Sequence, residues 1–178
     1  MCKFRDLVAG EIECRIGQVK DNGLTLLLYK DARVDMNILD ETVGADNWER
    51  EHYECKGNLY CRVGINTRDA IPDLPDRWVW KADCGTESNT EAEKGEASDS
   101  FKRACVNWGI GRELYTAPFI WVPADKCRIE NKKCYDKFVV EKILIENKRI
   151  TALAIWNTSK NVRAYLWQEP KKNEGAAT

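Results

Sequence analysis

Residues 94–115 read KGEASDSFKRACVNWGIGRELY, and the spacing of their apolar side chains decides the fold. The small and apolar residues of this stretch are Ala97, Phe101, Ala104, Cys105 and Trp108. They recur at i, i+4, i+7, i+8 and i+11, which places them on one face of an α-helix. The segment therefore predicts a long amphipathic helix that packs against another layer.

Residues on either side of this stretch predict where the helix begins and ends. Thr90, followed three residues later by Glu93, is typical of a capping box at a helix start. Gly109 and Gly111 predict a break, because glycine ends helices readily. A further turn is expected to carry the chain to Tyr115.

Three strands are predicted before the helix, at about 48–55, 58–66 and 77–83. Lys56-Gly57-Asn58 predicts a tight turn between the first two strands, and residues 67–76, which contain two prolines, predict a longer loop. Connections this short favour antiparallel pairing, because parallel strands need a long crossover.

The N-terminal part predicts extended structure over residues 11–30, with a turn at Asp21-Asn22-Gly23. A helix should follow. Asp31 can cap it and Gly44 can end it. Apolar residues recur between them at helical spacing: Val34, Ile38, Leu39 and Val43.

The C-terminal third predicts a second meander of two or three strands, in FVVEKILIE, ITALAIWN and VRAYLW. The fold class is therefore α+β: an antiparallel β-meander with a long helix packed across it, a β-β-β-α core, plus a C-terminal strand group. We expect one domain over residues 1–168, with its core at about 10–121, and a disordered tail at 169–178.

Composition favours a soluble cytoplasmic protein, since no apolar run is long enough for a membrane span or a leader. Residues 1–100 carry a net charge of −8 and residues 101–178 carry +7. This asymmetry fits either a polyanion-binding face or uneven surface charge. Eight cysteines include no C-x-x-C pair, and His52 is the only histidine, so reduced thiols are favoured over a metal site.

The polar side of the long helix carries Lys102 and Arg103, which could hold DNA phosphates from a rigid element. The alternative is an ordinary solvated helix face. Arg112 could extend the basic track beyond the glycine break. Arg33, at the start of the first helix, could reach the same groove or form a helix-surface salt bridge with Asp35 or Asp40.

Aromatic residues in or beside the predicted strands could stack bases or fill the core: Tyr29, Tyr53, Tyr60, Trp78 and Trp80. Carboxylates are plentiful, but no predicted strand carries the acid-x-lysine spacing of a metal-dependent nuclease. Gly109-Ile110-Gly111 lacks the residues of a phosphate-binding loop, so nucleotide binding is not indicated.

Two segments in order resemble the Rad52/Rad22 family of single-strand annealing proteins, and its short phage and prophage branch in particular. They are DARVDMNILDETVGADNW and EKGEASDSFKRACVNWGIGRELY. The resemblance covers about residues 10–121. It comprises a helix that opens with an arginine and ends before Asn-Trp, a three-strand meander, and a helix with F-K-R-A followed by W-G-I-G-R.

The resemblance implies ATP-independent annealing of complementary strands in recombination and repair, by a homo-oligomeric ring or filament. Single-stranded DNA would lie in a basic groove, with no cofactor, no metal ion and no enzyme chemistry. Lys102, Arg103 and Arg33 match the cations of that groove. A further family arginine is Val106 here, and Arg112 is a substitute for it.

Two other functions stay open at this point. A strand-binding or loader module would share the basic face without annealing. A metal-dependent nuclease would need Asp83 or Glu96 to act with a metal ion. A single-strand binding protein or an exonuclease would be a natural partner. A phage-encoded protein would act in the cytoplasm of the host cell.

Overall fold

The computed structural model describes residues 3–67, 77–86 and 92–170, apart from the side chains of 92–94. These residues form two compact units, each assembled from separate stretches of the chain. The first unit combines residues 1–7 with 30–112, and the second combines 8–29 with 113–178. The expectation of one domain over 1–168 stays a prediction.

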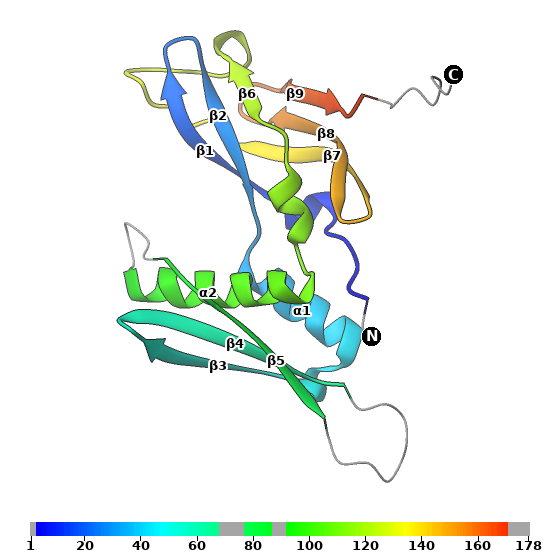
Figure 1. Cartoon of the computed structure of the whole chain (residues 1–178). Coiled ribbons are helices and arrows are strands. Elements are labelled where there is room, and N and C mark those ends of the chain that lie inside the picture. Colours follow the sequence, from blue (N-terminus) through cyan, green and yellow to red (C-terminus); the bar gives the residue numbers. More distant parts are fainter. Residues whose placement is uncertain (1–2, 68–76, 87–91, 171–178) are drawn as a thin grey trace, which may run out of the picture. The chain divides into compact units, whose positions relative to one another are not determined.

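The first unit contains the predicted β-β-β-α core. Figure 1 shows helix α2 lying across the sheet of β3, β4 and β5, with α1 beside it. The elements are α1 (Ala32–Val43), β3 (Trp48–Cys55), β4 (Asn58–Asn66), β5 (Trp78–Cys84) and α2 (Ala92–Trp108). The fold class predicted from the sequence is therefore confirmed, and the strand bounds agree within one residue.

The meander is fixed by its first turn and by its register. Lys56 and Gly57 both adopt positive φ values, 53° and 77°. This is the geometry of a two-residue hairpin turn that matches strand twist. Strands β3 and β4 then pair without a shift from Trp48 opposite Ile65 to Cys55 opposite Asn58.

One face of the meander is covered by α2. Cys61, Val63 and Ile65 alternate along β4 and are fully buried, as are Phe101 and Cys105 on the helix. Every second side chain of β4 points to this face and packs against the apolar face of α2. The apolar side chains of both elements are thereby removed from water. Of the helical face predicted from the sequence, Phe101, Ala104 and Cys105 are buried, and Ala97 and Trp108 toward its ends are half-buried.

Helix α1 forms as its sequence signals predict. The side chain of Asp31 accepts a hydrogen bond from the backbone N–H of Arg33, and Gly44 at φ 86° ends the helix. The buried residues are Asp35, Ile38 and Leu39. A carboxylate thus occupies the first position of the buried stripe.

The second unit is a six-stranded antiparallel sheet in the order β6-β2-β1-β7-β8-β9. Its strands are β1 (Glu13–Lys20), β2 (Gly23–Tyr29), β6 (Ile120–Pro123), β7 (Phe138–Glu146), β8 (Arg149–Asn157) and β9 (Val162–Gln168). The predicted N-terminal hairpin and C-terminal meander are therefore correct as elements. That they join into one sheet was not predicted.

The junction of this sheet depends on pairings that leave little trace in sequence. Strand β1 meets β7 only where Glu13 lies opposite Val139. Strand β6 is four residues long and pairs with β2. A strand that short gives too few alternating positions for a period to be recognised.

Several predicted features lie outside the described residues. They are the Thr90 cap, most of the 67–76 loop and the end of the tail. None of the helices in the described part of the chain combines the length and apolar character needed to cross a bilayer.

Gly85 should be intolerant of a side chain. A Cβ built there would lie 2.2 Å from the backbone oxygen of Glu96 in α2, and backbone cannot rotate aside. We expect Gly85→Ala to lower the free energy of unfolding by about 1–3 kcal/mol, the usual cost of overpacking. Urea unfolding followed by tryptophan fluorescence measures it. The control is Gly10→Ala, where a Cβ meets nothing within 4 Å. Equal stability of the two variants would contradict the prediction.

Candidate nucleic-acid interface

Arg33 is held at the start of α1 by the residue that caps the helix. Its Nε donates to Asp31 Oδ1 at 3.2 Å, and its terminal nitrogen donates to Asp31 Oδ2 at 3.1 Å. Its side chain is nevertheless 83% exposed. The predicted alternative named Asp35 or Asp40 as the salt-bridge partner of Arg33. The salt bridge is instead formed with Asp31, the residue that caps the helix, while Asp35 binds Lys30 and Asp40 accepts a hydrogen bond from Trp48. The guanidinium is thus oriented without being buried.

Lys102 lies near the same helix start. The hydrogen bonds that Arg33 donates hold the pKa of Asp31 below its ordinary value, and the positive charge of Lys102 lowers it further. Helix α1 packs against α2, and the side chain of Lys102 on α2 is half-buried. The fold therefore places Lys102 close enough for its charge to act on the carboxylate that Arg33 binds, although the two cations are far apart in sequence.

Beneath this pair lies a buried ion pair that the sequence reasoning missed. Lys30 donates to both oxygens of Asp35, and the two side chains are 4% and 0% exposed. Burial raises the pKa of Asp35 to about 6, although the charges of Lys30 and Lys102 oppose this rise. The available signal was Asp35, which precedes Ile38 and Leu39 on the apolar stripe.

Gly111 closes over the stem of Lys30. It has φ 68°, and a Cβ on it would lie 2.2 Å from Lys30 Cε. Only glycine meets both conditions, the left-handed backbone and the close approach. The Gly-Ile-Gly break after α2 therefore covers the buried lysine, with Ile110 fully buried between the glycines.

Arg103 points to a different neighbour from Lys102. Consecutive helix residues diverge by about 100°, so an adjacent pair does not share one direction. Arg103 Nε donates to Asp83 Oδ1 on β5 at 3.3 Å, and Asn107 also reaches that carboxylate. Its side chain is 40% exposed. Lys102 lies toward α1 and Arg103 toward β5.

Arg112 caps the C-terminal end of α2. Its guanidinium donates to the carbonyl of Val106 at 3.0 and 3.3 Å and to that of Asn107 at 3.3 Å. Cations are stabilised there, because the last carbonyls of a helix lack partners. Val106 follows Lys102 by one helical turn, so Arg112 brings a charge to the turn where the chain has valine.

Lys81 is a further cation at this helix end that the sequence did not reveal. Its Nζ donates to the carbonyl of Asn107 at 2.8 Å and lies 4.4 Å from the centre of the Trp108 ring. A lysine in the middle of a strand carries no signal by itself. Its position on the helix-facing side of β5 follows only from the register.

The other face of the meander carries aromatic side chains. Tyr53 and Tyr60 stack at 5.6 Å, and Trp78 and Trp80 stack at 6.0 Å. Arg62 lies over the Trp80 ring at 4.7 Å. The strand register places Tyr60 and Trp80 on the face of the sheet that is opposite to the face of the buried Cys61 and Val63. These rings therefore lie outside the core covered by α2.

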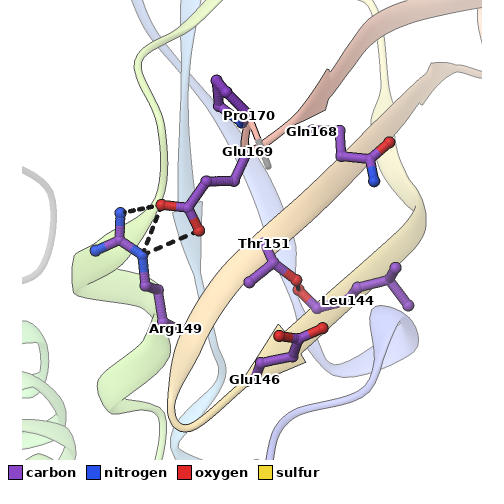
Figure 2. A pocket seen from close by; sticks show the side chains of 7 residues that line it. All are labelled: Leu144, Glu146, Arg149, Thr151, Gln168, Glu169 and Pro170. Atoms are coloured by element: carbon purple, nitrogen blue, oxygen red, sulfur yellow. Dashed lines mark hydrogen bonds and ion pairs between the residues drawn. The ribbon is translucent and has the colours of Figure 1, made fainter. Parts of the chain in front are cut away.

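The carboxylates considered for metal chemistry serve structural bonds. Asp83 holds Arg103, and Glu96 accepts the backbone N–H of Leu59 at 2.9 Å. Within the described ranges, no three potential ligands gather as a metal centre would require. Elsewhere, Figure 2 shows a pocket of the second unit in which Arg149 is bound to Glu169 at 2.6 Å. None of the predicted cations lines it.

Comparison with known proteins supports the relationship suggested by the sequence. Residues 5–133 match the family described as Rad52/22 family double-strand break repair protein. The "Single-stranded DNA-binding protein DdrA" of Deinococcus radiodurans is 34% identical over 111 residues, 58% of this chain and 47% of that protein. The chain thus spans about half the length of this relative. No solved structure matches.

Asp35 should titrate near pH 6 in the folded protein. Because its pKa is raised above the ordinary value, the folded state holds the proton more tightly than the unfolded chain does. Its contribution to stability is therefore complete below about pH 4 and is lost as the pH rises through about 6. Carboxyl carbon shifts in NMR measure the titration directly. A midpoint near 4 would contradict the burial argument.

Proposed function

The chain belongs to the Rad52/22 family of double-strand break repair proteins, and from this premise we propose that it binds single-stranded DNA and anneals complementary strands. The observation that supports the proposal is that Arg33 binds Asp31 at the start of α1, and that the positive charge of Lys102 on α2 also acts on this carboxylate. The relative from Deinococcus radiodurans is named a single-stranded DNA-binding protein, which supports the same substrate. The order of the quoted motifs favours the phage and prophage branch.

The binding step is electrostatic. Lys102 and Arg33 would contact phosphates first, since one is partly and the other largely open to solvent. Arg103 would join by exchanging Asp83 for a phosphate, because a partly exposed ion pair contributes only about 0–1 kcal/mol. Arg112 would continue the track past Val106. Together, these residues would fix the backbone of the strand without reading its sequence.

Annealing then needs no bond to be made or broken. Neutralised phosphates reduce the repulsion between two strands, and bases whose pairing edges face solvent stay available for pairing. Copies of the chain in a ring or filament would extend the track beyond the reach of one subunit. Neither a nucleotide nor a metal ion has a chemical role in this scheme, and a single-strand binding protein or exonuclease would supply the strand.

A strand-binding module without annealing activity is the second candidate. The same cations favour it, because phosphate contacts alone give binding. The two functions differ in their products. A loader leaves complementary strands unpaired, whereas an annealing protein accelerates the formation of duplex.

Removing the helix cations should weaken binding of single-stranded DNA. We expect Lys102→Ala combined with Arg103→Ala to lower the slope of log affinity against log salt by about 1.4, since each phosphate contact contributes about 0.7. Fluorescence anisotropy with a labelled oligothymidylate measures it. Lys3→Ala with Lys56→Asn is the matched control, because both lysines are exposed elsewhere in the first unit. An unchanged slope in the helix variant would overturn the site.

Annealing should occur without nucleotide and as an assembly. Complementary oligonucleotides that carry a donor and an acceptor dye should pair faster when the protein is present, with chelator added to remove metal ions. Light scattering should give a mass of several chains in the presence of single-stranded DNA. A strict monomer with and without DNA, or strand binding with no gain in pairing rate, would favour the loader function.

A further inference from the structure

The loop between β6 and β7 in the second unit is rich in basic residues and carries an exposed tyrosine. Residues 126–137 read KCRIENKKCYDK and contain five lysine or arginine residues against two acids. Tyr135 is 82% exposed among them. An aromatic ring between lysines is the pattern by which proteins bind unpaired nucleic acid.

The loop is held in one conformation from within. Asn157, fully buried, donates to Asp136 at 2.7 Å and to the Lys126 carbonyl at 3.0 Å. Asp136 also accepts the backbone N–H of Arg128, whose guanidinium donates to the Ser159 carbonyl. This network fixes both ends of the loop against the β8–β9 turn.

The tip of the loop is a tight hairpin. Glu130 and Lys133 exchange both backbone hydrogen bonds at 2.9 Å. Asn131 and Lys132 between them have positive φ values of 51° and 59°. This is again the two-residue turn that matches strand twist, so the segment after it leaves in a defined direction.

Beyond the hairpin, exposure alternates residue by residue. Cys134 and Asp136 are half-buried on the inner side, whereas Lys133, Tyr135 and Lys137 are exposed. Alternate residues of an extended segment share one side, so the ring stands between two ammonium groups. Their backbone positions span about 13 Å at the usual rise of an extended chain.

The charges on this side are uncommitted. Within the described part of the chain, no carboxylate lies at ion-pair distance from Lys132, Lys133 or Lys137, and no hydroxyl partner engages Tyr135. Glu130 is the acid of the hairpin itself, and Asp136 is bound on the inner side. An exposed aromatic ring with lysines on both sides, on a fixed backbone, is a preformed surface for a ligand that has both a flat apolar part and negative charge.

We propose that Lys133, Tyr135 and Lys137 form a second contact surface for single-stranded DNA, on the unit that does not contain Arg33 and Lys102. A base stacks on the Tyr135 ring, and the phosphates on either side of that base lie against Lys133 and Lys137. Lys132, on the hairpin tip, adds charge. The proposal rests on the proposed function, because both surfaces bind the same polymer.

Stacking on Tyr135 requires an unpaired base, so the surface distinguishes single strands from duplex. Tyr135→Ala should weaken binding of oligothymidylate at least about fivefold, the lower end of what one base–aromatic stack contributes. Tyr135→Phe keeps the ring and should bind within about twofold of the unaltered protein. Duplex binding should be the same in all three proteins.

The lysines are tested by salt dependence. Lys133→Gln combined with Lys137→Gln should lower the log–log salt slope by about 1.4. Lys20→Gln with Lys142→Gln, two exposed lysines of strands β1 and β7, is the matched control and should leave the slope unchanged. Iodouracil placed in the oligonucleotide should crosslink to Tyr135 on irradiation, and peptide mass spectrometry locates the site.

The outcomes separate the two proposals. If the unaltered protein binds single-stranded DNA and Tyr135→Ala binds equally well, this surface is wrong and the proposed function stands. Equal losses for single strands and duplex would also overturn it, because stacking would then play no part. If the unaltered protein binds no single-stranded DNA, the proposed function fails and this inference fails with it.

Discussion

The ion pair between Lys30 and Asp35 is the constraint on which the first unit depends. Both side chains are out of water, and each supplies the hydrogen-bond partner of the other. Removing one partner from a buried pair costs about 3–5 kcal/mol, since the remaining charge is uncompensated. The pair therefore ties the residue that precedes the helix cap, Lys30, to the first turn of α1.

This tie determines what surrounds it. Gly111 must stay a glycine, because the Lys30 stem occupies the space of its Cβ. The turn after α2 is consequently fixed relative to the start of α1. The charge of Lys102 acts on Asp35 of the pair, and Arg33 is oriented by Asp31 at the start of the same helix. A buried network thus lies beneath the part of the first unit that carries the exposed side chain of Arg33 and the half-buried one of Lys102.

Local sequence signals predicted most of the elements. Three such signals are the Asp31 cap, the Gly44 stop and the Lys56-Gly57 turn. Each depends only on backbone groups a few residues away in the sequence, so residue spacing was enough to predict it. The joining of β1 to β7 was not predictable in this way. It rests on a single pair, Glu13 opposite Val139, separated by more than a hundred residues.

The site was predicted less completely, because direction and pairing are tertiary properties. Lys102 and Arg103 are adjacent in sequence, yet one lies near α1 and the other binds Asp83. Lys30 precedes the cap residue Asp31 and has no feature in the sequence that marks it as buried, yet it is 4% exposed in the structure. Spacing identifies which residues are charged, but only packing decides which charges meet.

The anchoring of each cation decides how much of its charge remains for a polyanion. Arg103 is held by a carboxylate, so much of its field is cancelled nearby. Arg112 and Lys81 are held by the backbone carbonyls of Val106 and Asn107, which carry only partial charge. A cation anchored on a helix end keeps nearly its full charge while it satisfies carbonyls that would otherwise lack donors. The C-terminal turn of α2 therefore carries positive charge although residue 106 is a valine, because Arg112 and Lys81 supply that charge from outside the helix.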